Sequence, residues 1–213
     1  MNILQFKALT DNYNFIAYCE KSKECVGVDI FDSEKFISLV EKYDLKPVAI
    51  LNTHHHSDHV GGNKALSNKY PNLKFYASEY DFNNKRISNQ TNIAKEGDVV
   101  KFGDQSLKVL DIAGHTLGHI AYYNDNAIFV GDTIFVSGCG RVFEGTHKQM
   151  FEAIKKITQF ANENTEIYCG HEYTLSNVNF AYSLNNKYFE NYKKEIEEKR
   201  KNKIPTVPTT LSM

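Results

Sequence analysis

Short runs of apolar, β-branched and aromatic residues recur along most of the chain, separated by polar segments. Runs this short fit strands better than helices, because a helix needs about 10 residues or more to present one apolar face. They predict strands over 15–18, 26–30, 48–51, 73–76, 107–112, 120–123, 127–130 and 167–169. The chain up to about residue 170 is therefore rich in predicted strand.

One segment between these runs has helical spacing instead. Its apolar residues lie on one face of a helix, at Phe36, Leu39, Val40 and Tyr43. Asp32 or Ser33 can cap the start of this helix, and the helix breaker Pro47 follows its end. The segment therefore predicts a helix that connects two strands.

A second helix is predicted to begin at Thr146. Thr146 and Gln149 match a capping box, and the apolar stripe then continues at Met150, Ile154 and Ile157. Strands and helices are thus mixed, and no glycine-rich phosphate loop accompanies them. This mixture predicts a layered α/β fold without the usual signature of a nucleotide-binding domain.

From about residue 175 the pattern becomes helical throughout. The apolar side of this charged segment carries Tyr188, Phe189, Tyr192 and Ile196. Residues 185–204 contain seven Lys or Arg and four Glu, a local charge of +3. We interpret these charges as a solvated helix face, and the alternative is a surface that attracts an anionic substrate. The change of pattern predicts a main domain over 1–173 and a helical C-terminal region over 174–213.

The composition is that of an ordinary globular protein. Of the 213 residues, 41% are hydrophobic and 24% are charged. The net charge of −1 offers no general field for phosphate backbones, so we expect no nucleic-acid partner. No signal peptide or long apolar window is present, so we expect no membrane association. Four cysteines without a CxxC pair favour a reducing compartment, and we expect a cytoplasmic monomer.

Histidines are concentrated in one short segment. Four of the eight lie in LNTHHHSDHV, residues 51–60. His54 and His56 are two positions apart after a predicted strand, so in extended backbone they project to the same side, whereas His55 points away. Asp58 and His59 follow where the chain must turn, which directs them to a second position beside the first. The segment therefore predicts two adjacent metal sites.

Two metals need more ligands than this segment provides. Each of His115, Asp132 and His171 follows a predicted strand and adjoins a glycine, so we expect them to complete the sites. Imidazole and carboxylate ligands together favour zinc, with iron and manganese as alternatives. We expect four other residues to be structural, the last two as small buried hydrophobic groups: His119, His147, Cys139 and Cys169.

At these residues the chain resembles the metallo-β-lactamase superfamily. The superfamily motif HxHxDH stands here as His54, His56, Asp58 and His59. Within the superfamily the chain looks most like the glyoxalase II (hydroxyacylglutathione hydrolase) family, through TDNYNFI, THHHSDHVGG, GHTLGH, FVGDTIFVSGCGR, CGHEYT and PTVPTTL. The resemblance spans essentially the whole chain. It implies an αββα sandwich followed by a helical region, in agreement with the change of pattern near residue 175.

The resemblance also implies which residues hold the metals. One divalent ion would be bound by His54, His56 and His115, and the other by Asp58, His59 and His171, with Asp132 bridging them. Two ions would lower the pKa of a shared water from about 15.7 to about 7, so that hydroxide is available at neutral pH. Asp58 and Asp132 are the catalytic carboxylates in this interpretation. Asp29 can orient a ligand histidine through its free ring nitrogen, or it can cap a strand end.

The implied substrate is a glutathione thioester, S-lactoylglutathione, and the implied role is methylglyoxal detoxification. The thiol that leaves has a pKa of about 8.5, so it departs without an obvious general acid. Arg141, Phe143 and Tyr173 are the expected substrate contacts, with Phe143 where the family often has tyrosine. The chain ends soon after PTVPTTL, before the basic segment of longer relatives, so the C-terminal region is expected to be shortened.

Other members of the same fold provide the competing hypotheses. One is a persulfide dioxygenase with a single iron, and another is a hydrolase of a different ester, lactone or β-lactam. A third, from another class, is a noncatalytic module stabilised by metal, which would need a closed coordination shell. The complete set of ligands for two metals, together with CGHEY, favours the thioester hydrolase.

Overall fold

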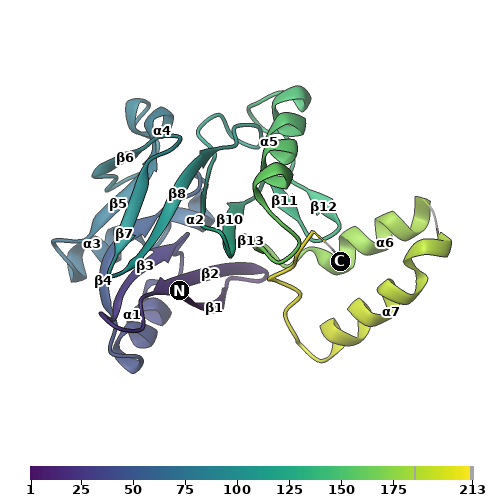
Figure 1. The fold of residues 1–213 in the computed structure, drawn as a ribbon, viewed down its shortest axis with the longest axis horizontal. Helices are drawn as coiled ribbons and strands as arrows, with labels where there is room; N and C mark the ends of the chain where they lie inside the picture. Colours follow the sequence, from purple (N-terminus) through teal and green to yellow (C-terminus); the bar gives the residue numbers. More distant parts are fainter. Residues whose placement is uncertain (185, 212–213) are drawn as a thin grey trace.

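The computed structural model describes residues 1–184 and 186–211, and it contains two β-sheets placed face to face (Figure 1). The first sheet has six strands in chain order: β1 (Asn2–Ala8), β2 (Asn12–Tyr18), β3 (Glu24–Val28), β4 (Lys46–Leu51), β5 (Lys74–Ser78) and β6 (Asn92–Ala94). Strands β1 to β3 pair antiparallel, and β3 to β6 pair parallel. Parallel pairing requires a crossover after each strand, and helices or loops supply it.

The second sheet has five strands in the order β13-β10-β9-β8-β7. Their bounds are β7 (Val99–Phe102), β8 (Gln105–Asp111), β9 (Ile120–Tyr123), β10 (Ala127–Gly131) and β13 (Glu166–Cys169). Only β10 and β13 are parallel, because α5 (His147–Phe160) connects them through a long crossover. A short hairpin of β11 (Ile134–Phe135) and β12 (Gly138–Cys139) lies between β10 and α5 in the chain.

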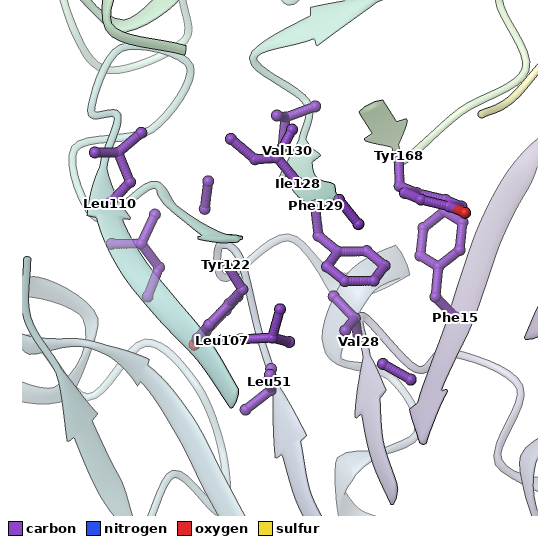
Figure 2. Close-up of a cluster of buried hydrophobic side chains, with 14 of the residues drawn as sticks. Phe15, Val28, Leu51, Leu107, Leu110, Tyr122, Ile128, Phe129, Val130 and Tyr168 are labelled. Carbon is purple, nitrogen blue, oxygen red and sulfur yellow. The ribbon is translucent and has the colours of Figure 1, made fainter. Parts of the chain in front are cut away.

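The main core lies between the two sheets. Alternating residues of β2 and β3, among them Phe15 and Val28, point inward and meet Phe129 and Tyr168 of the second sheet, as Figure 2 shows. The ring centroids of Phe15 and Phe129 are 5.5 Å apart. Both faces of β2 are buried, because Ile16 points to the opposite side. This double burial explains why residues 15–18 of β2 are all apolar or aromatic rather than alternating with polar residues.

Helices cover the outer faces of the sheets. Helix α1 (Ser33–Lys42) and helix α3 (Asn63–Lys69) bury Phe36 and Leu66 against the six-stranded sheet. Helix α5 packs on the five-stranded sheet, where its Phe160 ring lies 5.1 Å from that of Tyr123. Two short helices, α2 (Ser57–Val60) and α4 (Glu79–Asn83), follow β4 and β5. The predicted αββα sandwich is confirmed.

The predicted elements agree with the structure in type and differ at some ends. Every predicted strand and both predicted helices are present, with Asp32 as the cap of α1. The strand predicted over 26–30 ends at Val28, because Asp29 has φ 51°, in the left-handed region that no strand adopts. The strands that the pattern did not predict are short or lie at edges with mixed polarity: β1, β6, β7, β11 and β12.

The C-terminal part is a pair of helices followed by a tail that returns to the sandwich (Figure 1). Helix α6 (Thr174–Leu184) packs against helix α7 (Asn186–Lys201), and Ile196 of α7 is buried. The side chain of Tyr188 lies outside the described residues. The tail then buries Val207 in the main core and pairs Thr209 with Ile167 of β13.

Within the described residues, no helix combines the length and the apolar character that crossing a membrane requires. The division after residue 173 coincides with the change from sheets to helices, and it stays a prediction.

Candidate metal centre

The seven predicted metal ligands converge from separate loops at one edge of the sandwich. Each loop follows a strand, because this is where a rigid sheet can hold irregular backbone in a fixed position. The loop after β4 and helix α2 contribute His54, His56, Asp58 and His59, and the loops after β8, β10 and β13 contribute His115, Asp132 and His171. An isolated pairing between Asn12 and His171 joins the two sheets at this edge.

Three histidines form the first group of possible ligands. One ring nitrogen from each of His54, His56 and His115 lies within 4.8 Å of the others. The Nδ1 atom of His56 is 3.2 Å from Nε2 of His115. His54 is fully buried and His56 is half-buried, so the group opens on one side only. A single cation can therefore contact all three rings.

The second group combines a carboxylate with two histidines. Asp58, His59 and His171 also offer one atom each within 4.8 Å of one another. The Oδ2 atom of Asp58 lies 3.5 Å from Nε2 of His59 and 3.4 Å from Nε2 of His171. Asn12 holds the same oxygen through a hydrogen bond of 2.8 Å. The arrangement matches the second set of ligands expected from the sequence.

Asp132 lies between the two groups. Its Oδ1 atom is 3.5 Å from Nε2 of His59. Its Oδ2 atom is 3.2 Å from Nε2 of His171 and 3.7 Å from Nε2 of His115. The carboxylate thus contacts histidines of both groups, which is the geometry that a bridging ligand needs.

The outer ring nitrogens are held by acceptors, which leaves the inner nitrogens with lone pairs. Nδ1 of His115 donates to the carbonyl of Arg141 at 2.8 Å, and Nδ1 of His171 donates to Asp11 at 2.8 Å. A carbonyl oxygen can only accept, so the hydrogen of neutral His115 is on Nδ1. Each Nε2 is then free to bind a metal, in the arrangement typical of histidine ligands.

Asp29 organises two of the histidines at once. Its Oδ2 atom accepts from Nδ1 of His59 at 3.0 Å and from the Thr53 hydroxyl at 2.7 Å, and its Oδ1 atom accepts from the Thr53 amide at 2.8 Å. Since the Thr53 hydroxyl has donated its hydrogen to Asp29, it accepts from Nδ1 of His54 at 3.0 Å. Asp29 therefore contacts a predicted ligand as the sequence led us to expect, and its oxygens are occupied by these bonds.

Several buried polar atoms at the centre lack a partner. Among the described residues, no hydrogen bond reaches Nε2 of His54, Nε2 of His59 or Oδ1 of Asp132. A buried acceptor without a partner is costly, so native structures rarely keep one. Divalent cations bound to the two groups would satisfy these atoms, because His54 belongs to the first group, His59 to the second, and Asp132 lies between them. The residues present therefore fit a divalent metal site.

The electrostatics of the centre point in the same direction. Although burial opposes the charged form, hydrogen bonds to Asp132 and Asp58 raise the pKa of His171 to about 10. Burial likewise opposes ionisation of Asp132, yet the charge of His59 and the bond from His171 hold its pKa well below the usual range. The carboxylates thus demand positive charge nearby. A bound divalent metal would supply this charge, and histidines bind a metal in their neutral form.

His119 belongs to the surroundings of the centre, although it is not in either group of ligands. We expected it to be structural because no donor is close in sequence. In space its ring stacks on His54 at 4.6 Å, and its Nε2 atom accepts the amide hydrogen of Asp132 at 3.2 Å. It therefore holds the backbone of Asp132 in place. The repeated histidine in GHTLGH was the signal, because both rings face the same loop.

The remaining expectations divide between buried and exposed residues. Cys169 is buried as expected, but the expectation of a buried Cys139 was wrong, because this residue is exposed in the short strand β12. Neither cysteine is in a group of possible ligands within the described part of the chain. His147 is exposed in the first turn of α5. The sequence patterns did not reveal Asp11 and Asn12, whose side chains hold His171 and Asp58, because these two residues lie immediately before and at the start of β2, far from their partners in the sequence.

A cavity of about 470 Å³ opens beside the metal centre. His115 and Asp132 line it together with the three predicted substrate contacts, Arg141, Phe143 and Tyr173. The Tyr173 ring stacks on His171 at 4.7 Å with an angle of 4° between the planes. The remaining lining comes from the β11–β12 hairpin and from α6: Phe135, Cys139, Ser176 and Asn177.

Comparisons with known proteins identify the family. The model of the metallo-β-lactamase superfamily matches residues 29–207. Hydroxyacylglutathione hydrolase of Psychromonas ingrahamii is 40% identical over 217 residues, which cover all of this chain and 82% of the relative. The homologue from Crocosphaera subtropica, of the same name, is 41% identical over 220 residues, covering 99% and 84%.

Solved structures show the same fold. The crystal structure of ETHE1 from Myxococcus xanthus has a TM-score of 0.72 at 25% identity and covers 81% of this chain and 76% of its own. The structure of TTHA1623 in a di-iron-bound form has a TM-score of 0.66 at 25% identity, covering 80% and 92%. The chain belongs to the metallo-β-lactamase superfamily and, within it, to the hydroxyacylglutathione hydrolase family.

Proposed function

We propose that this chain is a metal-dependent thioester hydrolase that converts hydroxyacylglutathione, most simply S-lactoylglutathione, and water into glutathione and a 2-hydroxy acid. The observation that carries the proposal is the convergence of seven histidine and aspartate side chains beside one cavity, in a chain 40% identical to hydroxyacylglutathione hydrolases over its whole length. The substrate class is taken from the names of the relatives. The histidine and aspartate side chains are the metal ligands that metal-assisted hydrolysis of an acyl bond needs.

The proposal assigns two divalent ions to the centre. One ion would be held by His54, His56 and His115. The other would be held by Asp58, His59 and His171, and Asp132 would contribute to both sites. Zinc fits this mixture of nitrogen and oxygen ligands, and the di-iron form of a structural neighbour keeps iron as an alternative beside manganese. When bound, the ions would supply a nucleophile from water at neutral pH and polarise the thioester carbonyl.

The residues along the cavity would bind and orient the glutathione part. Glutathione carries two carboxylates, and Arg141 is an exposed cation on the wall that makes no ion pair with any described residue. Burial, followed by the charges of Asp11 and Asp132, raises the pKa of Tyr173 to about 12, so its hydroxyl stays protonated and can donate to a carboxylate. Phe143 places its ring 5.2 Å from His115 and supplies apolar contact without a hydroxyl.

Among the described residues that line the cavity, no Asp, Glu or His is left over to act as a general acid for the leaving group, because His115 and Asp132 are assigned to the metals. The hydroxyl of Tyr173 is assigned to substrate binding. A thioester needs no such acid. Its leaving group is a thiolate, which departs readily because the corresponding thiol has a pKa of only about 8.5. This match between site and substrate favours a thioester over an amide.

Thiol release from S-lactoylglutathione tests the proposed function. We expect turnover that chelator abolishes and that added divalent metal restores. Asp132→Ala is expected to lower kcat by at least about a hundredfold, since it removes the contact to both groups of ligands. No thiol release by the metal-loaded wild-type chain would refute the thioester hypothesis. Normal turnover and metal content in Asp132→Ala would refute the bridging role.

The competing activities are separated by the same preparation. One iron per chain, with oxygen consumed in the presence of glutathione persulfide, would indicate a dioxygenase instead. Faster turnover of a lactone or a cephalosporin than of the thioester would indicate a different hydrolase.

The proposal also includes a cytoplasmic monomer without a nucleic-acid partner, with a catalytic domain over 1–173 and a helical region over 174–213. The four free cysteines support a reducing compartment, and the net charge of −1 supports the absence of a nucleic-acid partner.

A further inference from the structure

Four charged or titratable side chains form a cluster beside the metal centre and outside the cavity. They are His55, Asp81, Arg86 and Glu144, and we call them the Arg86 cluster. Asp81 is completely buried in α4, and Arg86 follows that helix. None of these residues is among the proposed metal ligands or the proposed substrate contacts. Their position between the loops of the centre therefore needs another explanation.

Arg86 contacts every other member of the cluster. Its Nη1 atom donates to Oε2 of Glu144 at 2.8 Å, and its Nη2 atom donates to Oε1. Nη2 also lies 2.6 Å from Nε2 of His55, and Nε lies 3.8 Å from Oδ1 of Asp81. A guanidinium has donors only, so Nε2 of His55 accepts and the ring nitrogen Nδ1 carries the hydrogen. The fork of Arg86 thus has a defined geometry that lysine cannot reproduce.

The cluster joins the loops that hold the first group of ligands. His55 lies in the chain between His54 and His56, so the bond from Arg86 anchors the backbone that positions both. Oε2 of Glu144 accepts the amide hydrogen of Leu117 at 2.9 Å, and the amide of Glu144 donates to the carbonyl of His115 at 3.3 Å. One ion pair therefore holds the loop after β4 against the loop after β8.

Close packing leaves this arrangement little freedom. A Cβ atom on Gly118 would lie 2.6 Å from the carboxylate of Asp81, so the loop after β8 rests directly on that buried group. Oδ1 of Asp81 and Nδ1 of His55 have no hydrogen-bond partner within the described residues, and they are 3.7 Å apart. Arg86 supplies a formal positive charge beside this buried carboxylate. Without Arg86 no positive charge would compensate the desolvation cost of the buried Asp81 carboxylate, and the loops would shift to relieve this cost.

We propose that Arg86 is a positioning residue for the metal centre, which acts through Glu144 and His55 to hold His54, His56 and His115 in the geometry for metal binding. The inference rests on the metal assignment of the proposed function. It predicts a selective effect on the first group. In the described part of the chain, the side chains of the second group, Asp58, His59 and His171, make no hydrogen bond or ion pair with Arg86, and Asp11, Asn12 and Asp29 hold them instead.

Titration of the metal-free full chain with Zn²⁺ against a chelating dye tests this inference. In Arg86→Gln we expect one of two binding events to weaken by about 10- to 100-fold, the range seen when the groups that orient metal ligands are removed, while the other stays unchanged. The KM for S-lactoylglutathione should stay near the wild-type value, and kcat should recover at saturating metal. Arg86→Lys keeps the positive charge but loses the two-pronged geometry of the guanidinium. Its affinity at the weakened site should therefore lie between that of wild type and that of Arg86→Gln.

Lys95→Gln is the matched control. It removes a lysine–carboxylate pair with Glu79, on the same helix as Asp81, and should leave both binding events within about twofold of wild type. Unchanged metal affinities in Arg86→Gln would overturn the inference.

If Arg86→Gln does not fold, Glu144→Gln decides by the same titration, because it leaves Arg86 beside Asp81. A weakened site supports the inference and an unchanged one overturns it. The titration needs no substrate, so a wild-type chain that is inactive on the thioester would refute the proposed function and leave this test valid.

Discussion

At the scale of single residues, the hydrogen bonds behind the metal ligands matter as much as the ligands. Nδ1 of His115 is held by a backbone carbonyl, whereas Nδ1 of His59 is held by the charged carboxylate of Asp29. A carboxylate partner increases the basicity of the ring nitrogen that faces the metal, and it fixes the orientation of the ring. In the proposed metal site Asp29 would therefore influence the electronic character of the centre, a role that the sequence alone could not distinguish from a strand-end cap.

Replacing Asp29 with Asn tests this influence. Asn adopts the left-handed conformation of Asp29, φ 51°, readily, so the backbone should be preserved. The amide has a single acceptor oxygen, so the variant loses either the bond from the Thr53 amide to Oδ1 or the two bonds to Oδ2 from the Thr53 hydroxyl and His59, and it loses the negative charge in both cases. We expect metal affinity to fall by about 10- to 100-fold, measured by chelator competition. Asp32→Asn, at the exposed cap of α1, should bind metal like wild type, and equal losses in both variants would contradict the role.

Glu144 makes the stability of the metal-free protein depend on pH. Its hydrogen bonds with Arg86 lower its pKa from 4.5 to about 2. A group whose pKa is lower in the folded state stabilises the fold above its unfolded pKa and loses that effect as the pH falls. The thermal midpoint of wild type should therefore exceed that of Glu144→Gln at pH 7, and the difference should shrink between about pH 4.5 and pH 2.

The control for this pH series is Glu34→Gln, an exposed substitution in the first turn of α1. Its difference from wild type should change little over the same range. A gap for Glu144→Gln that is constant from pH 7 to the acid limit would contradict the ion-pair explanation.

At the scale of elements, local signals were sufficient where a helix or strand has its own boundary chemistry. The capping box of α5 is present as expected: the Gln149 amide donates to the Thr146 hydroxyl at 3.1 Å, and the Thr146 amide donates to the Gln149 side chain at 2.9 Å. Strand β7, by contrast, alternates exposed and buried residues with a lysine between them, and it is held by its pairing with β8. Its existence depends on a neighbour that no local pattern reveals.

Thr146→Ala should measure the contribution of this cap. We expect the free energy of unfolding to fall by about 1 kcal/mol in urea titration, because the Gln149 amide loses the hydroxyl that accepts its hydrogen. Helix α5 lies on the outer face of the second sheet, so KM and kcat should be unaffected. Thr158→Ala, near the other end of the same helix, is the control and should cost less. A loss of activity larger than the loss of stability would show that α5 has a further role.

At the scale of the whole molecule, Glu172 joins the C-terminal tail to the loop after β13, which contains His171. This carboxylate accepts from the Tyr13 hydroxyl at 2.5 Å, from the amide and hydroxyl of Thr206, and from Arg200 at 3.2 Å. It stands between His171 and Tyr173, so it connects the helical region to the centre and to the wall of the cavity. The two parts of the chain are thus joined by hydrogen bonds next to the proposed metal centre and the cavity.

Glu172→Gln should loosen that connection. The amide keeps the shape but loses the ion pair and one acceptor, for which we expect a loss of about 1 to 3 kcal/mol. Trypsin should then cleave faster at Lys201 and Lys203, and KM should rise more than kcat falls. Glu190→Gln, which removes an exposed pair with Lys194, is the control and should change neither. Unchanged proteolysis in Glu172→Gln would show that the tail is held by the burial of Val207 alone.

The sequence by itself determined the types of elements, the layered class and the donor residues, because these properties depend on side chains within a few positions of one another. The spacing of His54 and His56 and the capping box of Thr146 are examples. Pairing of distant segments decided the rest. Asp11 reaches His171 across 160 positions, and Arg86 reaches Glu144 across 58. Strand order and register set these meetings, and such long-range contacts have no local periodicity from which they could be predicted.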